Sequence, residues 1–159
     1  MVDVGAKPLT RREAEARALV VFPRGVLKRI LAGRGPKGPV TEVARTAAVL
    51  AAKRTDEIVP LCHSIPLDAV TVSFRSSGAD RLEIRVRAAC TGRTGVEMEA
   101  LVGASVAALT VYDMSKALDH GIRIERVELV EKSGGSRGEW RSEKAGRSEK
   151  TGRARRTVR

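Results

Sequence analysis

The chain has 159 residues, of which 42% are hydrophobic and 3% aromatic, and it carries a formal net charge of +11. This length supports one globular domain with a core of Ala, Val, Leu and Ile. A membrane-spanning protein and a disulfide framework are excluded, because no apolar run is long enough to cross a bilayer and the chain has two cysteines. The N-terminus lacks a signal-peptide pattern, so we expect a cytoplasmic protein.

The positive charge points to an anionic partner: a nucleic acid, a charged surface or a polyphosphate ligand. It is unevenly placed, since residues 141–159 hold eight Arg or Lys and two Glu, which is +6 of the +11. This segment nearly repeats itself, as RSEKAG and then RSEKTG, and such low complexity is typical of disorder. We therefore predict a folded domain over residues 1–140 and a basic, disordered tail over residues 141–159.

The first elements of the domain are a strand and a short helix. Residues 13–22 alternate between apolar and mostly charged side chains, which predicts the strand, and residues 24–32 predict the helix. The loop that follows, GRGPKGP at residues 33–39, places three glycines and two prolines around Arg34 and Lys37. Local sequence leaves two interpretations open: a solvated linker, or a loop that presents a lysine to a phosphate.

A second helix is predicted over residues 41–55, with Thr41 as its N-cap. Its predicted apolar face consists of Val43, Ala47, Leu50 and Ala51. Lys53 lies outside this face, where it is either solvent-facing charge or a ligand contact.

The next segment, residues 56–66, carries two prolines around the pair Cys62 and His63 and cannot be helical throughout. A metal site that also uses Cys90 and His120 is disfavoured, because the usual ligand spacings are missing. A Cys–His catalytic dyad is disfavoured too, since neighbours on an extended chain point to opposite sides. We favour a ligand contact for His63 and a core position for Cys62.

Three more strands and a long helix complete the domain. Residues 70–74 and 82–88 predict a hairpin, the long helix ends at Gly121, and residues 122–130 predict a last strand. The order strand, helices, strand, strand, helix, strand is that of an α+β protein with the ferredoxin-like, split βαβ arrangement: an antiparallel sheet with helices packed on one face. The glycine-rich residues 132–140 are expected to end the fold.

We expect the functional site at the long helix. Residues 100–111 are apolar apart from Ser105 and Thr110, so this helix is buried on more than one side. Several of its residues are small, which permits another element to pack close to its axis. Ionisable side chains gather at its two ends: Arg93, Glu97 and Glu99 at the first, Asp113 and Lys116 at the second.

Asp113 and Lys116 are three residues apart and are therefore neighbours on the helix. They form either a plain surface ion pair or, if partly buried, a pair that can pass a proton. Glu99 and Asp113 are separated by about 21 Å along the axis, which is too far for one small ligand to contact both. Two separate sites, or one site shared between subunits, would explain this, and the small residues in the middle of the helix favour the shared site.

Six stretches of the chain carry a family resemblance: MVDVGAK, KGPVTEVARTAAVLAAKRT, IVPLCH, TGRTGVEMEAL, SVAALTVYDMSKA and EKSGG. With them the chain resembles the cyclic pyranopterin monophosphate synthase family of molybdenum cofactor biosynthesis, over about residues 1–140. The resemblance implies a lyase that converts a cyclised dihydroguanosine triphosphate to cyclic pyranopterin monophosphate and releases diphosphate, with no metal or redox cofactor. It also implies a ferredoxin-like fold and a hexamer built as a trimer of dimers, with the site at the dimer interface.

The resemblance further implies roles for individual residues. By motif, Asp113 looks like the general acid/base, Lys116 its partner, and Lys37 a second catalytic lysine. Lys53 and Lys132 look like substrate or phosphate contacts. The implied substrate-binding segments are Leu61-Cys62-His63 and Met98-Glu99. These residue types suit the reaction, because a triphosphate needs several cations and departing diphosphate develops negative charge that ammonium groups stabilise.

This sequence departs from the family pattern near the implied site. Ser115 stands where the family usually has Cys, and LCHSIPL replaces the more usual LCHPLPL while His63 is kept. The basic tail is not part of the family pattern.

Two other functions were weighed against the lyase. An RNA-binding module would share the sheet and the basic charge, but it needs exposed aromatics for base stacking. Phe22 and Phe74, the two phenylalanines, both fall on apolar strand faces. A catalytically inactive homologue is disfavoured because the residues with implied catalytic roles are present. Nucleic acid and membrane are therefore not expected as partners.

Overall fold

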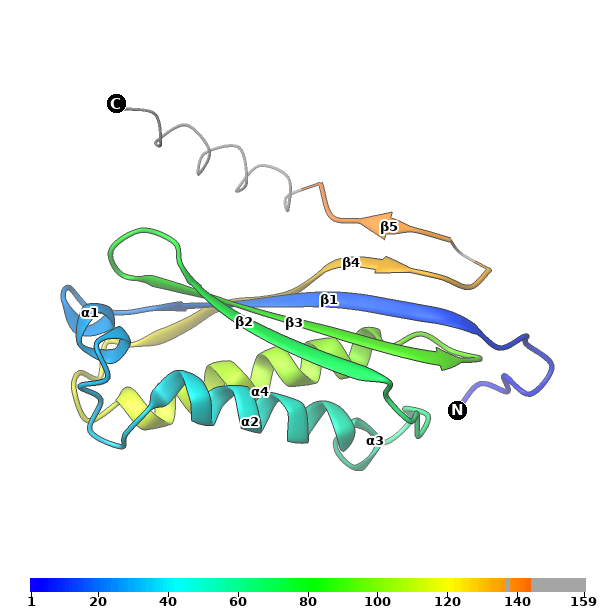
Figure 1. The fold of residues 1–159 in the computed structure, drawn as a ribbon, viewed down its shortest axis with the longest axis horizontal. Coiled ribbons are helices and arrows are strands. Elements are labelled where there is room, and N and C mark those ends of the chain that lie inside the picture. Colours follow the sequence, from blue (N-terminus) through cyan, green and yellow to red (C-terminus); the bar gives the residue numbers. More distant parts are fainter. Residues whose placement is uncertain (137, 144–159) are drawn as a thin grey trace.

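A five-stranded antiparallel sheet covered on one face by two long helices makes up the computed structural model, which describes residues 1–136 and 138–143 (Figure 1). The elements are β1 (Thr10–Val21), α1 (Val26–Leu31), α2 (Val40–Lys53), α3 (Thr55–Ile58), β2 (Ala69–Ser76), β3 (Arg81–Gly92), α4 (Glu97–Ser115), β4 (Arg123–Ser133) and β5 (Trp140–Arg141). The strand order is β2-β3-β1-β4-β5. This confirms the predicted split βαβ fold, because helices join β1 to β2 and β3 to β4.

β1 lies in the middle of the sheet and has two chemically different faces. Its alternate residues from Ala14 to Val20 face the helices and are almost completely buried. The residues between them lie on the opposite, charged sheet face, where Arg17 Nε donates to Glu128 Oε1 at 2.6 Å. Other ion pairs on this face include Arg85–Glu15 and Arg87–Glu131. The period-two pattern of the sequence therefore separates the core from a surface of paired charges.

α2 and α4 run side by side in opposite directions beneath the sheet (Figure 1). A Cβ atom on Gly103 of α4 would lie 3.0 Å from Val86 Cγ1 of β3 and 3.2 Å from the Ala48 carbonyl oxygen of α2. The small residues of α4 thus serve close packing within the chain. Our reason for a shared site, that these residues admit a second subunit, is wrong, since α2 and the sheet already occupy that space.

We expect Gly103→Val to lower the free energy of unfolding by about 1–3 kcal/mol, because the added atoms overpack a contact that includes backbone. Urea denaturation followed by circular dichroism measures this change. Thr110→Val, on the same helix but partly exposed, serves as the control and should change stability by no more than about 0.5 kcal/mol. Equal stability of the two variants would contradict the close approach of α2 and α4.

The predicted apolar face of α2 is wrong in part. Val43 and Leu50 are 42% and 53% exposed, whereas Ala44 and Ala48 are fully buried. Alanines occupy the buried side because α4 approaches too closely for larger residues, so the large apolar residues point outward. With Ile58, Met98 and Leu109 they form an outer helical face that is apolar and exposed.

Several boundaries also differ from the prediction. Thr41 does not cap α2, which begins at Val40 with no side-chain cap. α4 ends at Ser115 instead of Gly121, because Leu118 N donates to the Ser115 carbonyl and closes a tighter turn. In the described part of the chain, no helix is long and apolar enough to cross a membrane.

The glycine-rich segment after β4 is a turn that leads into β5, a strand that the sequence did not predict. Lys132 of β4 pairs with Trp140 of β5. Gly134 and Gly135 have φ values of 92° and 76°, the left-handed region that favours glycine. Residues 144–159, most of the predicted basic tail, lie outside the described residues.

Candidate functional site

The three residues with implied catalytic roles meet at the end of α4. Lys37 Nζ and Lys116 Nζ each lie 2.7 Å from a different carboxylate oxygen of Asp113. Lys116 follows the last turn of α4, and Lys37 lies in the loop before α2. Because the two helices are antiparallel, the end of α4 lies beside the start of α2, and both lysines reach Asp113. All three side chains are about half exposed, so the cluster is open on its outer side.

The two lysines set the charge state of this cluster. Hydrogen bonds from Lys116 and from Lys37 lower the pKa of Asp113 to about 2. In return, the hydrogen bond to Asp113 raises the pKa of Lys116. At neutral pH the cluster therefore contains one carboxylate, which can accept a proton, between two ammonium groups, which can donate protons and bind anions.

A second set of predicted residues lies where α4 begins. Leu61, His63 and Lys132 line a cavity of about 440 Å³. A cavity of about 530 Å³ lies beside it, and its lining includes the same three residues together with Cys62 and Met98. His63 Nε2 lies 2.8 Å from the Val2 carbonyl oxygen. A carbonyl accepts and cannot donate, so His63 carries a proton on Nε2 and the N-terminal segment fixes the orientation of its ring.

Glu99 is buried next to this second set of residues and lines neither cavity. It is 2% exposed, and Cys62 Sγ donates to its Oε1 at 3.7 Å. Within the described residues its Oε2 has no hydrogen-bond partner. Burial raises the pKa values of both Glu99 and Cys62. The pair therefore joins the Leu61–His63 segment to the first turn of α4.

The two sets lie at opposite ends of α4 (Figure 1). Asp113 follows Glu97 by 16 residues, which corresponds to about 24 Å along a helix axis. The structure thus places most of the predicted residues in two groups, which we call half-sites, and these lie too far apart for one small molecule to contact both. The Asp113 half-site is defined by Lys37, Asp113 and Lys116, and the His63 half-site by the residues that line the two cavities.

Comparison with known proteins identifies the family. The sequence model of the MoaC family matches residues 1–135. The chain belongs to the MoaC family. It is similar to the cyclic pyranopterin monophosphate synthase of Thermomicrobium roseum, with 52% identity over 144 residues that cover 90% of this chain and 87% of the relative. The proteins of the same name from Chloroflexus aggregans (49% over 146 residues, 91% and 88% covered) and Novosphingobium aromaticivorans (51% over 142 residues, 89% and 90% covered) are also similar.

Three more cations of this MoaC family chain line the His63 half-site: Lys7, Arg12 and Arg93. The sequence analysis placed Arg93 among the ionisable residues where the long helix begins, but it gave Lys7 and Arg12 no role. Arg12 donates to the carbonyl oxygens of Gly92 and Arg93, each at 3.4 Å. A Cβ on Gly135 would overlap the Arg12 guanidinium, so the glycine makes room for this side chain. Lys7 and Arg93 could have been identified as candidate site residues from the sequence, because they lie in MVDVGAK and TGRTG, two of the stretches that carry the family resemblance.

Lys132 and Lys53 have different positions in the MoaC family chain. Lys132 Nζ lies 2.7 Å from Glu97 Oε1. Burial alone would raise the pKa of Glu97, but the hydrogen bond from Lys132, a backbone hydrogen bond and the charges of Lys132 and Arg12 together lower it. Lys53 ends α2 on the side where α4 begins, is exposed, and lines neither cavity. Ser115, in the position of the usual family Cys, is fully buried, and within the described residues its hydroxyl has no hydrogen-bond partner.

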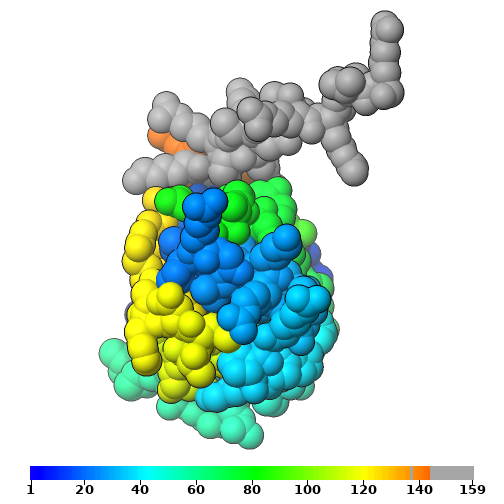
Figure 2. Space-filling view, turned by 90° about the vertical axis from the view of Figure 1, so that its left-hand side faces the viewer, coloured from blue at the N-terminus to red at the C-terminus, as the bar shows by residue number. Residues whose placement is uncertain are grey.

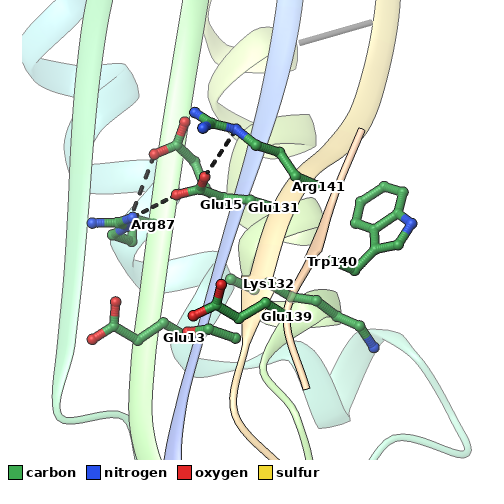
Figure 3. A pocket seen from close by; sticks show the side chains of 10 residues that line it. Glu13, Glu15, Arg87, Glu131, Lys132, Glu139, Trp140 and Arg141 are labelled. Atoms are coloured by element: carbon green, nitrogen blue, oxygen red, sulfur yellow. Dashed lines mark hydrogen bonds and ion pairs between the residues drawn. The ribbon is translucent and has the colours of Figure 1, made fainter. Parts of the chain in front are cut away.

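A further cavity of about 420 Å³ lies on the charged sheet face beside β5 (Figure 3). Its lining includes Glu13, Glu15, Glu131 and Glu139. Arg87 Nη2 lies 2.6 Å from Glu131 Oε1, so part of this negative charge is already neutralised. The excess of carboxylates disfavours a triphosphate in this cavity. Glu13 and Lys132 also line the adjoining His63 half-site, where cations are more numerous.

The sequence also raised a metal site and an RNA-binding sheet face, which can be compared with the described residues of the MoaC family chain. Among residues 1–136 and 138–143, no group of three His, Cys, Asp or Glu side chains could hold a metal ion. Cys90, one of the four residues weighed as metal ligands, is fully buried in the core. Phe22 is buried as well, and ion pairs occupy the sheet face on which an RNA-binding module would stack bases.

Proposed function

We propose that this chain is a lyase that converts a cyclised dihydroguanosine triphosphate to cyclic pyranopterin monophosphate and releases diphosphate, in molybdenum cofactor biosynthesis. The observation that carries this proposal is the Asp113 half-site, a carboxylate held between two ammonium groups, in a chain about half identical to proteins named cyclic pyranopterin monophosphate synthase.

The Asp113 half-site is proposed to perform the proton transfers. Asp113 accepts a proton, and Lys116 or Lys37 donates one, because these are the forms that the mutual ion pairs favour at neutral pH. When substrate phosphates draw Lys37 away, Asp113 loses one of the two cations that lower its pKa and becomes a stronger base. The ammonium groups also stabilise the negative charge that develops on departing diphosphate.

The His63 half-site is proposed to hold the substrate. Lys7, Arg12, Arg93 and Lys132 place four cations around one cavity, which suits a polyanion. Leu61 and Met98 line the neighbouring cavity and offer apolar contact to a ring system. Lys53 is proposed as a further phosphate contact from the end of α2.

We propose that two subunits complete each site, because neither half-site suffices alone. A two-fold partner packed on the outer helical face would cover Val43, Leu50 and Leu109, which are 42%, 53% and 57% exposed. An antiparallel pair of α4 helices that cross near Ser105, midway between Glu97 and Asp113, would bring the Asp113 half-site of one chain to the His63 half-site of the other. Three such dimers would make the hexamer that the family resemblance implies.

Incubation of the purified chain with the cyclised dihydroguanosine triphosphate tests the proposed activity. Diphosphate and cyclic pyranopterin monophosphate are expected in equal amounts, measured by a coupled diphosphate assay and by mass spectrometry. A folded chain that leaves the substrate unchanged would contradict the proposal and favour an inactive homologue.

A further inference from the structure

Residues 23–39 carry positive charge without any acidic residue. This segment contains Arg24, Lys28, Arg29, Arg34 and Lys37 and no acidic residue. All five side chains belong to exposed residues. Among the described residues Lys37 is the one member of this set with an ion pair, which it forms with Asp113. Within residues 1–136 and 138–143 the other four side chains form no ion pair or hydrogen bond, and we call the surface they form with Lys37 the α1 cationic surface.

The α1 cationic surface lies next to the Asp113 half-site. Figure 2 looks onto this end of the molecule, where the blue and cyan segments of α1 and its following loop lie beside the yellow segment that follows α4. Arg34 N donates to the Arg29 carbonyl at 2.9 Å, which folds the loop back onto α1. The two halves of the surface are therefore held together by backbone bonds, and Lys37 is its inner edge.

The acidic groups at this end do not cancel the charge of the surface. Asp80 and Asp119 accept hydrogen bonds from the backbone N–H groups of Gly25 and Gly121. Glu125 lies between Arg81 and Arg123, at 3.7 and 3.8 Å. Asp80 also lines a cavity with Arg24 and Lys28 and offsets part of their charge. One carboxylate among the cations of the surface still leaves a net positive field beside the site.

We infer that the α1 cationic surface collects the polyanionic substrate from solution and delivers it to Lys37. The identity of the substrate rests on the proposed function, but the inference concerns how a triphosphate reaches the site. Cations that lie within a Debye length of one another, about 8 Å at physiological ionic strength, add their fields. A charged surface of this kind raises the association rate of an oppositely charged ligand by about 10–1,000-fold.

The double variant Lys28→Glu with Arg29→Glu tests this inference, because neither residue belongs to the two half-sites. At low ionic strength kcat/KM is expected to fall about ten-fold while kcat stays unchanged. At high salt, where the Debye length shrinks to about 3 Å, wild type and variant should converge. The control is Arg155→Glu with Arg156→Glu, which changes the net charge equally in the tail and should leave kcat/KM near the wild-type value.

Three results would overturn the inference: no loss of kcat/KM at low salt, a loss that persists at high salt, or an equal loss in the control. Calorimetric titration with inorganic triphosphate gives a second readout that needs no turnover, and the double variant should bind it more weakly at low salt. A wild-type chain without lyase activity would refute the proposed function, whereas equal triphosphate affinity of wild type and variant would refute the collecting surface.

Discussion

Replacement of Asp113 by Asn is expected to lower kcat for diphosphate release by about 100–10,000-fold, the usual contribution of a positioned acid or base. The asparagine keeps the size of the side chain but cannot accept a proton, and it removes the anion that holds Lys37 and Lys116 at 2.7 Å. Substrate affinity should change far less, because the cations of the His63 half-site remain. Steady-state kinetics with the cyclised triphosphate separates the two effects.

The pH profile adds a readout that a merely structural role would not change. The hydrogen bond to Asp113 raises the pKa of Lys116, so the wild-type lysine stays protonated to higher pH than a free lysine. In Asp113→Asn this support is lost, and the alkaline limb of the remaining activity should move to lower pH. The acidic limb of the wild-type profile should not arise from protonation of Asp113 in the substrate-free enzyme. The pKa of about 2 leaves this carboxylate ionised across the neutral range.

Asp119→Asn is the matched control for this variant. Asp119 is an exposed aspartate shortly after α4 whose Oδ1 accepts a hydrogen bond from Gly121 N, and an asparagine oxygen can accept the same bond. Its kinetics should equal those of wild type. Equal diphosphate release from Asp113→Asn and Asp119→Asn, with both variants folded by circular dichroism, would remove the assigned role of Asp113.

The sequence predicted the fold well wherever one face of an element is buried and the other is charged. β1 and β3 follow this rule, and their alternation was sufficient to place them. The rule failed on α2, because it assumes that large apolar residues are core residues. Here the close contact between Ala48 and Gly103 leaves room for alanines alone, so Val43 and Leu50 point outward. The missing strand β5 is two residues long and follows glycines, which give no periodic signal.

The sequence allowed candidate site residues to be named, but it did not give their arrangement. Lys37 and Asp113 are 76 residues apart, and they meet because α2 and α4 are antiparallel, which no local pattern specifies. The distance between Glu99 and Asp113 did predict that one small ligand cannot contact both ends of α4, and the shared site itself stays a prediction. Arg12 was not predicted as a site residue, since on the strand pattern it is simply a charged residue at the end of β1, and its position depends on the turn at Gly135.

A mixture of Asp113→Ala and His63→Ala subunits is expected to regain activity that neither variant has alone. In a shared site each heterodimer contains one doubly damaged site and one intact site. Random exchange of subunits should therefore restore about one quarter of wild-type activity. His63 is the better partner variant than Glu99, because Glu99 is 2% exposed and its removal would leave Cys62 without its acceptor. The subunits are exchanged under mild denaturant, and diphosphate release is measured after refolding.

The control for this experiment is a mixture of Asp113→Ala and Lys116→Ala, two lesions in the same half-site. No pairing of these subunits yields an intact site, so this mixture should stay as inactive as its components. Different affinity tags on the two variants confirm that mixed oligomers have formed. If such oligomers form and the Asp113–His63 mixture stays inactive, each chain must use its own two half-sites. A conformational change would then have to bring together groups that α4 holds about 24 Å apart, which a rigid helix packed against the sheet along its whole length does not permit.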